Sequence, residues 1–488
     1  MNMNYRNYLF FFLIIFIFFC FRVFFWNWID LDLSFDEAQY YSWSNNLAWG
    51  YYSKPPMLSW VIKISTMICG NSELCIRMPS PFIHSLIAFF IGLAAYNFSF
   101  QVNKSIIFIA AFIWLLIPGV SLSTGFISTD VPLLFFTSLV LWLSSLVVTN
   151  KKSNRNNFYI ILIGVFLAFG FLSKYAEIYL FIAIFFALIF EKSIRNEFQE
   201  IFDFKKIFLL FVTFFILIMP HLIWNLDNEF ITVQHTVSNA NLIGNWSGFI
   251  NLFKFFIEQF LVFGPIIFSL LLFILLKYNY LSVNERYLIF LTFTPIIIIL
   301  VQAFVSRAHA NWAAIAYVSG TILVSIYFIK IWNNWGKSLF YFNIIIGFLF
   351  MILIPLSGYY NMGVDPYKKN RGWSELGLAI SNIYSRYPNS VLVTDDRRVL
   401  AEALYYMKVK PKKWVRWNVD GIIHDHYELV TNHKELDSEI GLMVSSEKEN
   451  KHFKDSFERA IFLENIIRPI GINNTKIYKV WLLEGYKN

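Results

Sequence analysis

Runs of apolar residues separated by short polar loops occupy the first three quarters of the chain. A transmembrane helix needs about 20 predominantly apolar residues to cross the hydrocarbon core of a bilayer. Runs of this character lie at residues 8–26, 80–100, 105–122, 131–149, 158–173, 177–190, 207–223, 251–276, 287–305, 311–329 and 338–357. The pattern predicts a polytopic α-helical membrane domain at residues 1–359, with about 11 transmembrane helices.

The first loop, residues 27–79, contains no run that could cross the membrane. Its most apolar piece, residues 57–68, is too short and carries Lys63, which favours a helix lying in the membrane interface. No small-residue cleavage site follows the first apolar run. We therefore expect that run to be kept as a transmembrane helix and not removed as a signal peptide.

Residues 360–488 have a different pattern, in which helical and strand-like segments alternate. Residues 373–386 and 397–407 have the apolar spacing of helices. Strand-like segments lie at residues 390–394, 413–417, 440–445, 460–463 and 476–483. This region is predicted to be a soluble α/β domain, and it contains no glycine-rich phosphate loop that would indicate nucleotide hydrolysis.

The composition supports the same division. Only 15% of the 488 residues are charged, against about 25% in soluble domains. Residues 360–488 hold 37 of the 72 charged residues, although they make up only the last quarter of the chain. The 57% hydrophobic content excludes a disordered chain. The net charge of +8 forms no concentrated basic patch, so nucleic acid is not an expected partner.

The three cysteines, Cys20, Cys69 and Cys75, are too few for a disulfide framework. We expect Cys69 and Cys75 to be two unpaired small apolar residues. The alternative is a disulfide, if their loop faces an oxidising compartment. The cysteines and histidines have no metal-binding spacing.

The Lys and Arg content of the short loops predicts the orientation. With the N-terminus in the cytoplasm, the inner loops hold 13 Lys and Arg residues and the outer loops hold 5 or 6. An odd number of helices then places the C-terminal domain outside the cytoplasm. The conspicuous polar residues of the membrane part all fall on the outer side. Because ionisable groups at membrane depth are costly, we expect them to line one outward-facing polar cavity.

Two acidic residues open the helix predicted after the first apolar run. Ser34 and Glu37 have the spacing of a capping box, which would give Glu37 a structural role. The box does not require Asp36, whose carboxylate could accept a proton from an incoming hydroxyl. Asp36 and Glu37 are both candidate catalytic residues, with Asp36 as the candidate base.

Lys54 is followed by Pro55 and Pro56, which hold it in an extended or turn conformation. A fixed ammonium group close to the bilayer suits the phosphate of a lipid. The alternative interpretation is an anchor lysine whose stem lies along the membrane interface.

The later outer loops supply the other candidate residues. Asp130 could be a second catalytic acid or the N-cap of the helix that contains Pro132. Lys174 could bind a phosphate or form a local salt bridge with Glu177, three residues away. His221, Arg307 and His309 are further candidates for substrate binding. His221 could instead lie in a wet interface beside aromatic residues, whereas the planar fork of Arg307 suits a phosphate or carboxylate.

These motifs resemble those of membrane glycosyltransferases that use polyprenyl-phosphate sugars. The resemblance rests on residues 35–41, 47–52 and 54–57, and on the later motifs at residues 129–132, 220–225 and 310–312. The similar families are the protein O-mannosyltransferase-like family and the bacterial aminoarabinose-to-lipid-A transferases (glycosyltransferase families 39 and 83). In the C-terminal domain, residues 365–377 and 396–406 are similar to the bacterial branch.

The resemblance implies a GT-C fold and an active site on the periplasmic face of the bacterial inner membrane. It implies an inverting transfer of a sugar from a polyprenyl phosphate to lipopolysaccharide, lipid A or another envelope acceptor. Asp36 would be the base and Asp130 the second acid. Lys54 would bind the donor phosphate, with Lys174 and Arg307 as possible helpers.

One position departs from the family pattern. The aminoarabinose transferases have a carboxylate, associated with a metal, directly before the Lys-Pro-Pro motif, whereas this chain has Ser53. The departure argues against a bound divalent metal and against aminoarabinose as the sugar. No other cofactor is expected, because the energy for transfer is already in the donor bond.

Two other function classes fit the pattern less well. A transporter or flippase of lipid-linked sugars would be indicated by inverted repeats or paired broken helices, and the sequence has no such symmetry. An envelope scaffold would leave the outer charged residues unexplained. A glycosyltransferase is the leading hypothesis, with the acceptor's nature deciding whether Asp36 removes a proton or only positions the acceptor.

Overall fold

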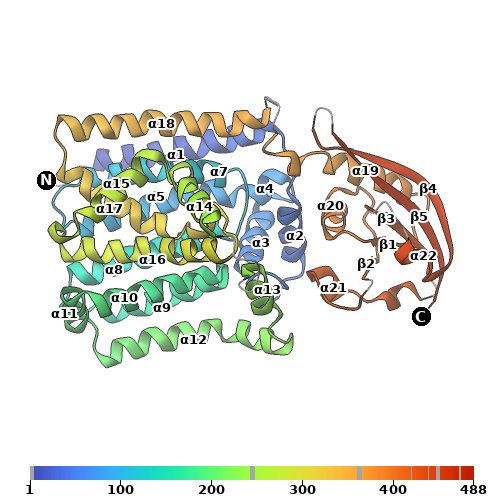
Figure 1. The fold of residues 1–488 in the computed structure, drawn as a ribbon, viewed down its shortest axis with the longest axis horizontal. Helices are drawn as coiled ribbons and strands as arrows, with labels where there is room; N and C mark the ends of the chain where they lie inside the picture. The colour runs from blue at the N-terminus through green and yellow to red at the C-terminus, as the bar shows by residue number, and fades with distance from the viewer. Residues whose placement is uncertain are drawn as a thin grey trace. The chain divides into compact units, whose positions relative to one another are not determined.

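The computed structural model describes residues 5–241, 248–359, 365–418, 420–437, 439–446, 451–471 and 474–487. The chain forms two compact units (Figure 1). Residues 1–26, 54–61 and 77–355 form the first, here called the membrane unit. Residues 27–53, 62–76 and 356–488 form the second, here called the α/β unit. The predicted division at residue 359 therefore cuts across segments that pack together, because two pieces of the first loop belong to the α/β unit.

Most helices of the membrane unit coincide with the predicted apolar runs. Its helices are α1 (Tyr5–Ile29), α5 (Pro79–Phe98), α6 (Ser105–Leu115), α7 (Pro118–Ser123), α8 (Asp130–Thr149), α9 (Asn156–Ser173), α10 (Ile178–Phe190), α11 (Lys192–Ile201), α12 (Phe204–Asp227), α13 (Ile231–Ala240), α14 (Gly248–Val262), α15 (Pro265–Leu276), α16 (Val283–Val305), α17 (Ala316–Lys330) and α18 (Asn334–Tyr359). Short 3₁₀ helices, η1 (Tyr175–Glu177), η2 (Tyr278–Tyr280) and η3 (Ala310–Ala313), lie between them.

The number of membrane crossings remains a prediction. Among the described residues, 7 helices are long and apolar enough to span, or 8 if α14 and α15 together form one span. α6 and α17, and α10 together with η1, match predicted runs but are shorter. The bend of 115° between α14 and α15 occurs at Gly264, whose φ of +101° is a conformation that other residues rarely adopt.

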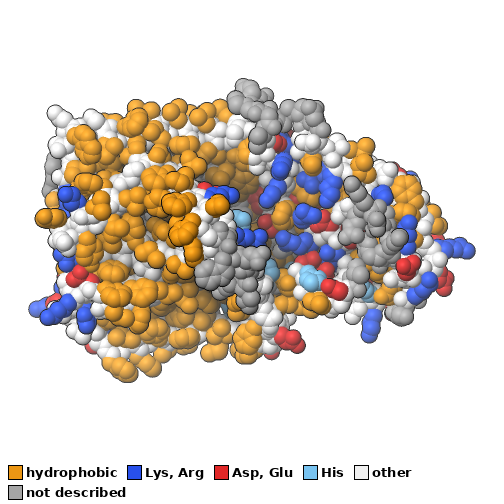
Figure 2. Space-filling view, in the orientation of Figure 1, with side chains coloured by type: hydrophobic (Ala, Val, Ile, Leu, Met, Phe, Trp, Pro, Cys, Tyr) orange, Lys and Arg blue, Asp and Glu red, His pale blue; other side chains and the backbone are white. Residues whose placement is uncertain are grey.

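Helices of the membrane unit differ in how much apolar surface they expose. α12 turns Phe208, Phe211 and Phe215 outward, as expected for a helix in contact with lipid. Figure 2 shows one face of this unit, and hydrophobic side chains cover much of that face. α17 is almost entirely buried, and its Ser319 hydroxyl accepts a hydrogen bond of 3.0 Å from Thr292 of α16. Small hydroxyl residues allow helices to approach closely inside a membrane.

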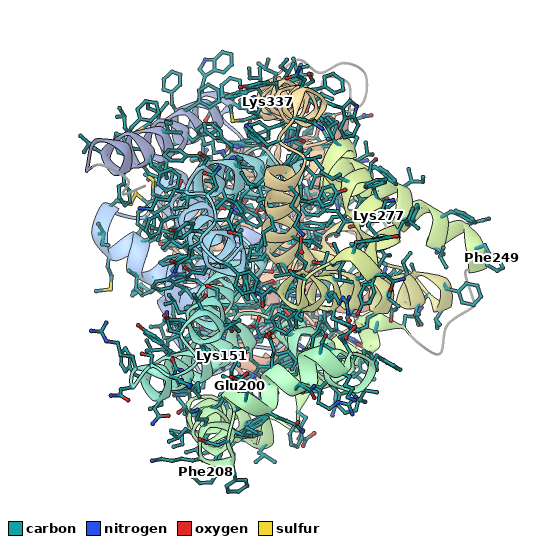
Figure 3. All side chains as sticks on the ribbon, turned by 90° about the vertical axis from the view of Figure 1, so that its left-hand side faces the viewer. Lys151, Glu200, Phe208, Phe249, Lys277 and Lys337 are labelled. Carbon is teal, nitrogen blue, oxygen red and sulfur yellow. A yellow bond between two sulfur atoms is a disulfide. The ribbon has the colours of Figure 1, made fainter. Side chains whose placement is uncertain are left out.

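Basic residues gather at one end of the membrane unit. α8 and α9 are consecutive helices, and the loop between them carries Lys151, which forms an ion pair of 2.8 Å with Glu200 of α11. In Figure 1 the start of α18, which holds Lys337, lies at the left-hand end of this unit, and Figure 3 looks onto that side. α8 starts and α9 finishes at the opposite end, where the candidate site residues Asp130 and Lys174 lie.

The α/β unit combines first-loop helices with a five-stranded sheet. Its elements are α2 (Phe35–Asn45), the second part of α3 (Met57–Cys69), α4 (Glu73–Arg77), η4 (Lys368–Asn370), α19 (Trp373–Tyr384), β1 (Val391–Thr394), α20 (Arg397–Tyr406), β2 (Trp414–Arg416), α21 (His426–Val430), η5 (His433–Leu436), β3 (Gly441–Ser445), α22 (Lys451–Lys454), β4 (Phe457–Pro469) and β5 (Thr475–Tyr486). The sheet order is β2-β1-β3-β5-β4. β1 is parallel to both β2 and β3, and β5 is antiparallel to β3 and β4.

The sheet confirms the predicted α/β class and corrects one strand length. β1 is buried along its whole length, as expected for a parallel strand covered on both faces. Its Val391 and Val393 join Met443 and Leu483 in the core of one face. The prediction limited β4 to residues 460–463, whereas the strand has 13 residues. Its charged and exposed positions, typical of an edge strand, hide the apolar pattern on which the prediction relied.

Cys69 and Cys75 form a disulfide, so the expectation that they are unpaired was wrong. α3 ends at Cys69, and the chain then turns through Gly70, whose φ is +91°, before α4 begins at Glu73. This turn brings the two Cα atoms to 5.8 Å, within the range that a disulfide bridges. Cys20 is a free thiol on α1.

Candidate active site

Asp130 is the centre of a polar cluster in the membrane unit. It is the first residue of α8, and its Oδ1 forms an ion pair of 2.7 Å with Nζ of Lys174. Its Oδ2 accepts a hydrogen bond of 2.8 Å from Nδ2 of Asn311, in η3. The Asp130 and Lys174 side chains are only 11% and 20% exposed. Three segments that are far apart in the sequence are therefore joined at one carboxylate.

Lys174 reaches Asp130 because the chain breaks its helical path there. α9 ends at Ser173, and Lys174 has an extended backbone with φ −161° and ψ 136° before η1 begins. Both structural alternatives for these residues are wrong. Thr129, and not Asp130, holds the N-cap position of α8, and the Glu177 carboxylate accepts a hydrogen bond from Thr137 at 3.0 Å.

Two buried side chains that the sequence analysis missed hold η3 in place. Gln259 of α14 donates a hydrogen bond of 3.3 Å to the carbonyl oxygen of Ala310, directly before Asn311. The Tyr317 hydroxyl of α17 donates to Oε1 of Gln259 at 2.6 Å. Gln259 interrupts an apolar run with an amide group, which is the signal that could have identified it, whereas Tyr317 gives no such signal in a chain with 26 Tyr residues.

His221 lies inside the membrane unit, on α12, and is fully buried. The interpretation of His221 as a residue of a wet interface stays a prediction, because burial within the protein does not fix its depth in the membrane. Its Nε2 is 2.8 Å from the hydroxyl oxygen of Tyr175, the residue that follows Lys174. The amide of Asn225, one helical turn later, donates to the His221 carbonyl oxygen at 3.0 Å. His221 thus links α12 to the interruption between α9 and η1 that positions Lys174. Tyr175, which makes this link, was not predicted from the sequence.

Arg307 and His309 lie in the loop between α16 and η3, and both are exposed. Nη2 of Arg307 donates a hydrogen bond of 3.0 Å to Oδ1 of Asn239, on α13. The His309 ring meets the Trp312 ring edge-on, with 5.3 Å between ring centroids. Asn311 therefore contacts Asp130, whereas the hydrogen bond described for Arg307 is to Asn239 of α13.

The remaining candidates lie nearer the N-terminus. Lys54 belongs to the membrane unit, is partly exposed, and precedes the buried Pro55 and Pro56. Asp36 and Glu37 lie in the first turn of α2, in the α/β unit.

Glu37 and Ser34 complete the predicted capping box. The Glu37 carboxylate accepts hydrogen bonds from the backbone N–H of Ser34 at 2.9 Å and from its hydroxyl at 3.1 Å. Glu37 is buried, which fits its capping role, whereas Asp36 is partly exposed.

The described residues show no metal centre. No three His, Cys, Asp or Glu side chains among them are grouped so as to hold a metal ion. Ser53 provides a hydroxyl, a weaker metal ligand than a carboxylate, at the position before Lys54.

Known proteins are similar to this chain over most of its length. A family model described as dolichyl-phosphate-mannose-protein mannosyltransferase matches residues 53–224. The lipid A galacturonosyltransferase RgtD of Rhizobium johnstonii is 32% identical over 401 residues, which cover 79% of this chain and 80% of that protein. The chain belongs to this family of GT-C membrane glycosyltransferases. The predicted enzyme class is confirmed, and the alternative of a transporter or flippase is set aside.

Solved structures confirm the GT-C glycosyltransferase fold. The apo structure of ArnT from Cupriavidus metallidurans is similar with a TM-score of 0.66 and 12% identity, over 96% of this chain and 97% of that one. ArnT from the same organism bound to undecaprenyl phosphate gives a TM-score of 0.64 and 13% identity, over 97% of each chain. The glycosyltransferase is therefore a multi-pass membrane protein whose likeness to ArnT includes the C-terminal domain.

Proposed function

We propose that this glycosyltransferase transfers a sugar, with inversion, from a polyprenyl phosphate to lipid A. The proposal draws on its relative RgtD, a lipid A galacturonosyltransferase, and on ArnT, whose fold it shares and which has been solved with undecaprenyl phosphate. Galacturonic acid is accordingly the first sugar to test. The observation that carries the proposal is the cluster of Asp130, Lys174 and Asn311, a charged site that three distant segments of the membrane unit build together.

In the proposed reaction, the bond between the anomeric carbon and the phosphate oxygen breaks and the phosphate keeps the electron pair. Lys54 stabilises the charge that develops on this leaving group. An acceptor oxygen attacks the opposite face of the anomeric carbon, and Asp36 accepts its proton if the acceptor is a hydroxyl. If the acceptor is an ionised lipid phosphate, no proton is lost and Asp36 positions the acceptor. The products are the glycosylated acceptor and the polyprenyl phosphate.

Lys174 is proposed to assist Lys54 at the donor phosphate. A lysine ammonium has three donors, and Asp130 takes one of them. Asp130 therefore fixes the position of a cation whose other donors can meet an anionic ligand. Asn311 holds the second oxygen of Asp130, so the carboxylate cannot rotate away. Arg307 and His309 are proposed as binding residues at the edge of the same site.

The proposed location is the inner membrane, with the N-terminus in the cytoplasm and the α/β unit in the periplasm. The basic residues at one end of the membrane unit support this orientation, because cytoplasmic loops carry an excess of Lys and Arg. The disulfide of Cys69 and Cys75 supports it as well, because disulfides persist in oxidising compartments such as the periplasm.

We also propose that transfer does not require a divalent metal, because Ser53 stands where a carboxylate is expected. Purified enzyme treated with EDTA is expected to keep its transfer rate. Loss of activity that returns on adding Mg²⁺, Mn²⁺ or Zn²⁺ would contradict this.

The proposed function is tested by mass spectrometry of lipid A from a strain that lacks this protein. The expected result is the loss of one sugar from lipid A, and the mass difference identifies that sugar. The native chain is expected to restore the sugar, whereas Asp36→Asn, although inserted and folded, is not. Unchanged lipid A in the deletion strain would refute the acceptor, and normal lipid A with Asp36→Asn would refute the role of Asp36.

A further inference from the structure

Helix α2, which carries Asp36, packs within the α/β unit against α20. Nη1 of Arg397, the first residue of α20, donates a hydrogen bond of 2.8 Å to Oε1 of Gln39. The Arg397 guanidinium also lies over the Phe35 ring, 5.3 Å from its centroid. Phe35 directly precedes Asp36, and Gln39 lies three residues after it. One arginine of the C-terminal segment therefore contacts residues on both sides of the candidate base.

Tyr406, the last residue of α20, holds the segment that leads into α2. Its hydroxyl accepts a hydrogen bond of 2.7 Å from the backbone N–H of Leu33 and donates one to the Glu73 carboxylate of α4. Burial, together with the charge of Glu73, raises the pKa of Tyr406, so the hydroxyl keeps the proton that this second bond needs. The backbone at the start of α2 is thus tied to α20 and to α4 by one hydroxyl group.

Two further contacts complete the support of α2. Asp32 accepts a hydrogen bond of 2.8 Å from the backbone N–H of Trp373, at the start of α19. Near the other end of α2, the rings of Trp43 and Tyr51 stack with centroids 4.4 Å apart, and the His426 ring meets both edge-on. The C-terminal segment therefore contacts α2 near both ends and at its first turn.

We propose that the C-terminal α/β segment has a role in catalysis: Arg397 and Tyr406 are positioning residues that fix Asp36 in its reactive place. This inference rests on the proposed role of Asp36. Reacting groups must be placed within a fraction of an ångström, and a displacement of about 1 Å costs about 100-fold in rate. A general packing role would need only apolar contact, whereas these polar contacts meet the residues directly around Asp36.

The test uses full-length enzyme and two matched pairs of variants. Arg397→Ala is compared with Arg398→Ala, because Arg398 pairs instead with Asp396 at 2.7 Å. Tyr406→Phe is compared with Tyr405→Phe, because the Tyr405 hydroxyl donates to the Asn71 carbonyl oxygen at 2.9 Å. Each Phe variant removes one oxygen atom, so the fold is expected to persist. The measurements are kcat, KM for the polyprenyl-phosphate sugar, and the melting temperature.

Arg397→Ala and Tyr406→Phe are expected to lower kcat by about 10- to 100-fold. KM for the donor is expected to stay near the native value, because Lys54 and Lys174 belong to the membrane unit. Arg398→Ala and Tyr405→Phe are expected to keep native kinetics. In addition, Gln39→Ala combined with Arg397→Ala is expected to be no worse than Arg397→Ala alone, since the two side chains act through one contact.

Three results separate this inference from the proposed function. If Asp36→Asn is inactive but Arg397→Ala and Tyr406→Phe match their controls, the positioning role is refuted and the role of Asp36 stands. A rise in KM with unchanged kcat also refutes it, because the residues would then support donor binding. If Asp36→Asn keeps full activity, the role of Asp36 fails and the positioning inference fails with it.

Discussion

Among the described residues, Asp130 is held by Lys174 and Asn311, which come from different segments of the membrane unit. The sequence identified Asp130 and Lys174 because ionisable groups are rare among apolar residues and therefore conspicuous, whereas Asn311 stood out only as part of the motif at residues 310–312. It could not identify Tyr175 and Tyr317, since a tyrosine in an aromatic-rich chain, with 26 Tyr residues, gives no sign of its partner. The predicted alternatives for Asp130 and Lys174 failed for a related reason. Local spacing describes neighbours along the chain, whereas both residues are paired across helices.

Asp130→Asn is expected to lower kcat/KM by about 100-fold, the loss typical of removing one well-placed electrostatic contact. The amide keeps the shape of the carboxylate and can still bond to Asn311, but it no longer attracts Lys174. The measurement is transfer from a polyprenyl-phosphate sugar by purified enzyme. Asp227→Asn is the matched control, because Asp227 is an exposed carboxylate at the end of α12. Equal activity of the two variants would contradict the role given to Asp130.

Glu402 gives the α/β unit a predictable dependence on pH. Its side chain is fully buried in α20, and burial raises its pKa well above the ordinary value, helped by the charges of Asp32, Glu37 and Glu73 and opposed by Arg468. The folded state therefore keeps a proton that the unfolded state releases above about pH 4.5. Stability from this group is present at low pH and is lost as the pH rises towards the raised pKa.

Glu402→Gln, which is neutral at every pH, is expected to flatten this dependence. The difference in melting temperature between variant and native protein should grow from pH 5 to pH 8, in favour of the variant. Differential scanning fluorimetry across that range measures it. If the difference in melting temperature between the two proteins stayed constant from pH 5 to pH 8, Glu402 would not titrate differently in the folded and unfolded states.

At the scale of elements, apolar periodicity located the helices well and their breaks poorly. Each predicted run contains a helix, because about 20 consecutive apolar residues have few other stable forms in a membrane. The interruption at Lys174 and the bend at Gly264 lie at the edges of such runs, where composition changes little. α11 was missed because it is short and mostly polar. β4 was cut short because only part of it is apolar.

The connection between α3 and α4 offers a test at this scale. Thiol labelling of denatured enzyme without reductant is expected to modify Cys20 alone, and labelling after reduction is expected to modify all three cysteines. Mass spectrometry of the labelled protein counts the modified thiols. Three labelled cysteines before reduction, in protein exported normally, would rule out the disulfide and remove one support for a periplasmic α/β unit.

At the scale of the whole molecule, the two-part organisation was foreseen but its boundary was simplified. The high charge of residues 360–488 marked the C-terminal segment. No local signal, however, shows that Leu33, Trp43 and Tyr51 pack with residues more than 300 positions later, because burial partners cannot be read from sequence distance. The α/β unit is therefore discontinuous in a way that composition alone could not reveal.

The fragment 360–488, expressed alone, is expected not to fold cooperatively. It lacks α2, whose Ala38, Tyr40 and Trp43 are buried, and it would expose the groups that these residues cover. Near-ultraviolet circular dichroism during heating measures the cooperativity of unfolding. The matched control protein carries residues 27–76 joined to residues 360–488 by a flexible linker, and this one is expected to melt cooperatively. A sharp transition for the bare fragment would refute the expectation.

The contact between α2 and α20 also forms late in biosynthesis. The ribosome makes α2 early, yet Arg397 and Tyr406 emerge some 350 residues later, which at bacterial speeds is a delay of roughly 20–70 s. Throughout that interval the candidate base sits on a helix whose partner does not yet exist. If Arg397 and Tyr406 position Asp36 as proposed, a half-made enzyme does not act on the lipid carriers around it, and activity begins only when synthesis is nearly complete.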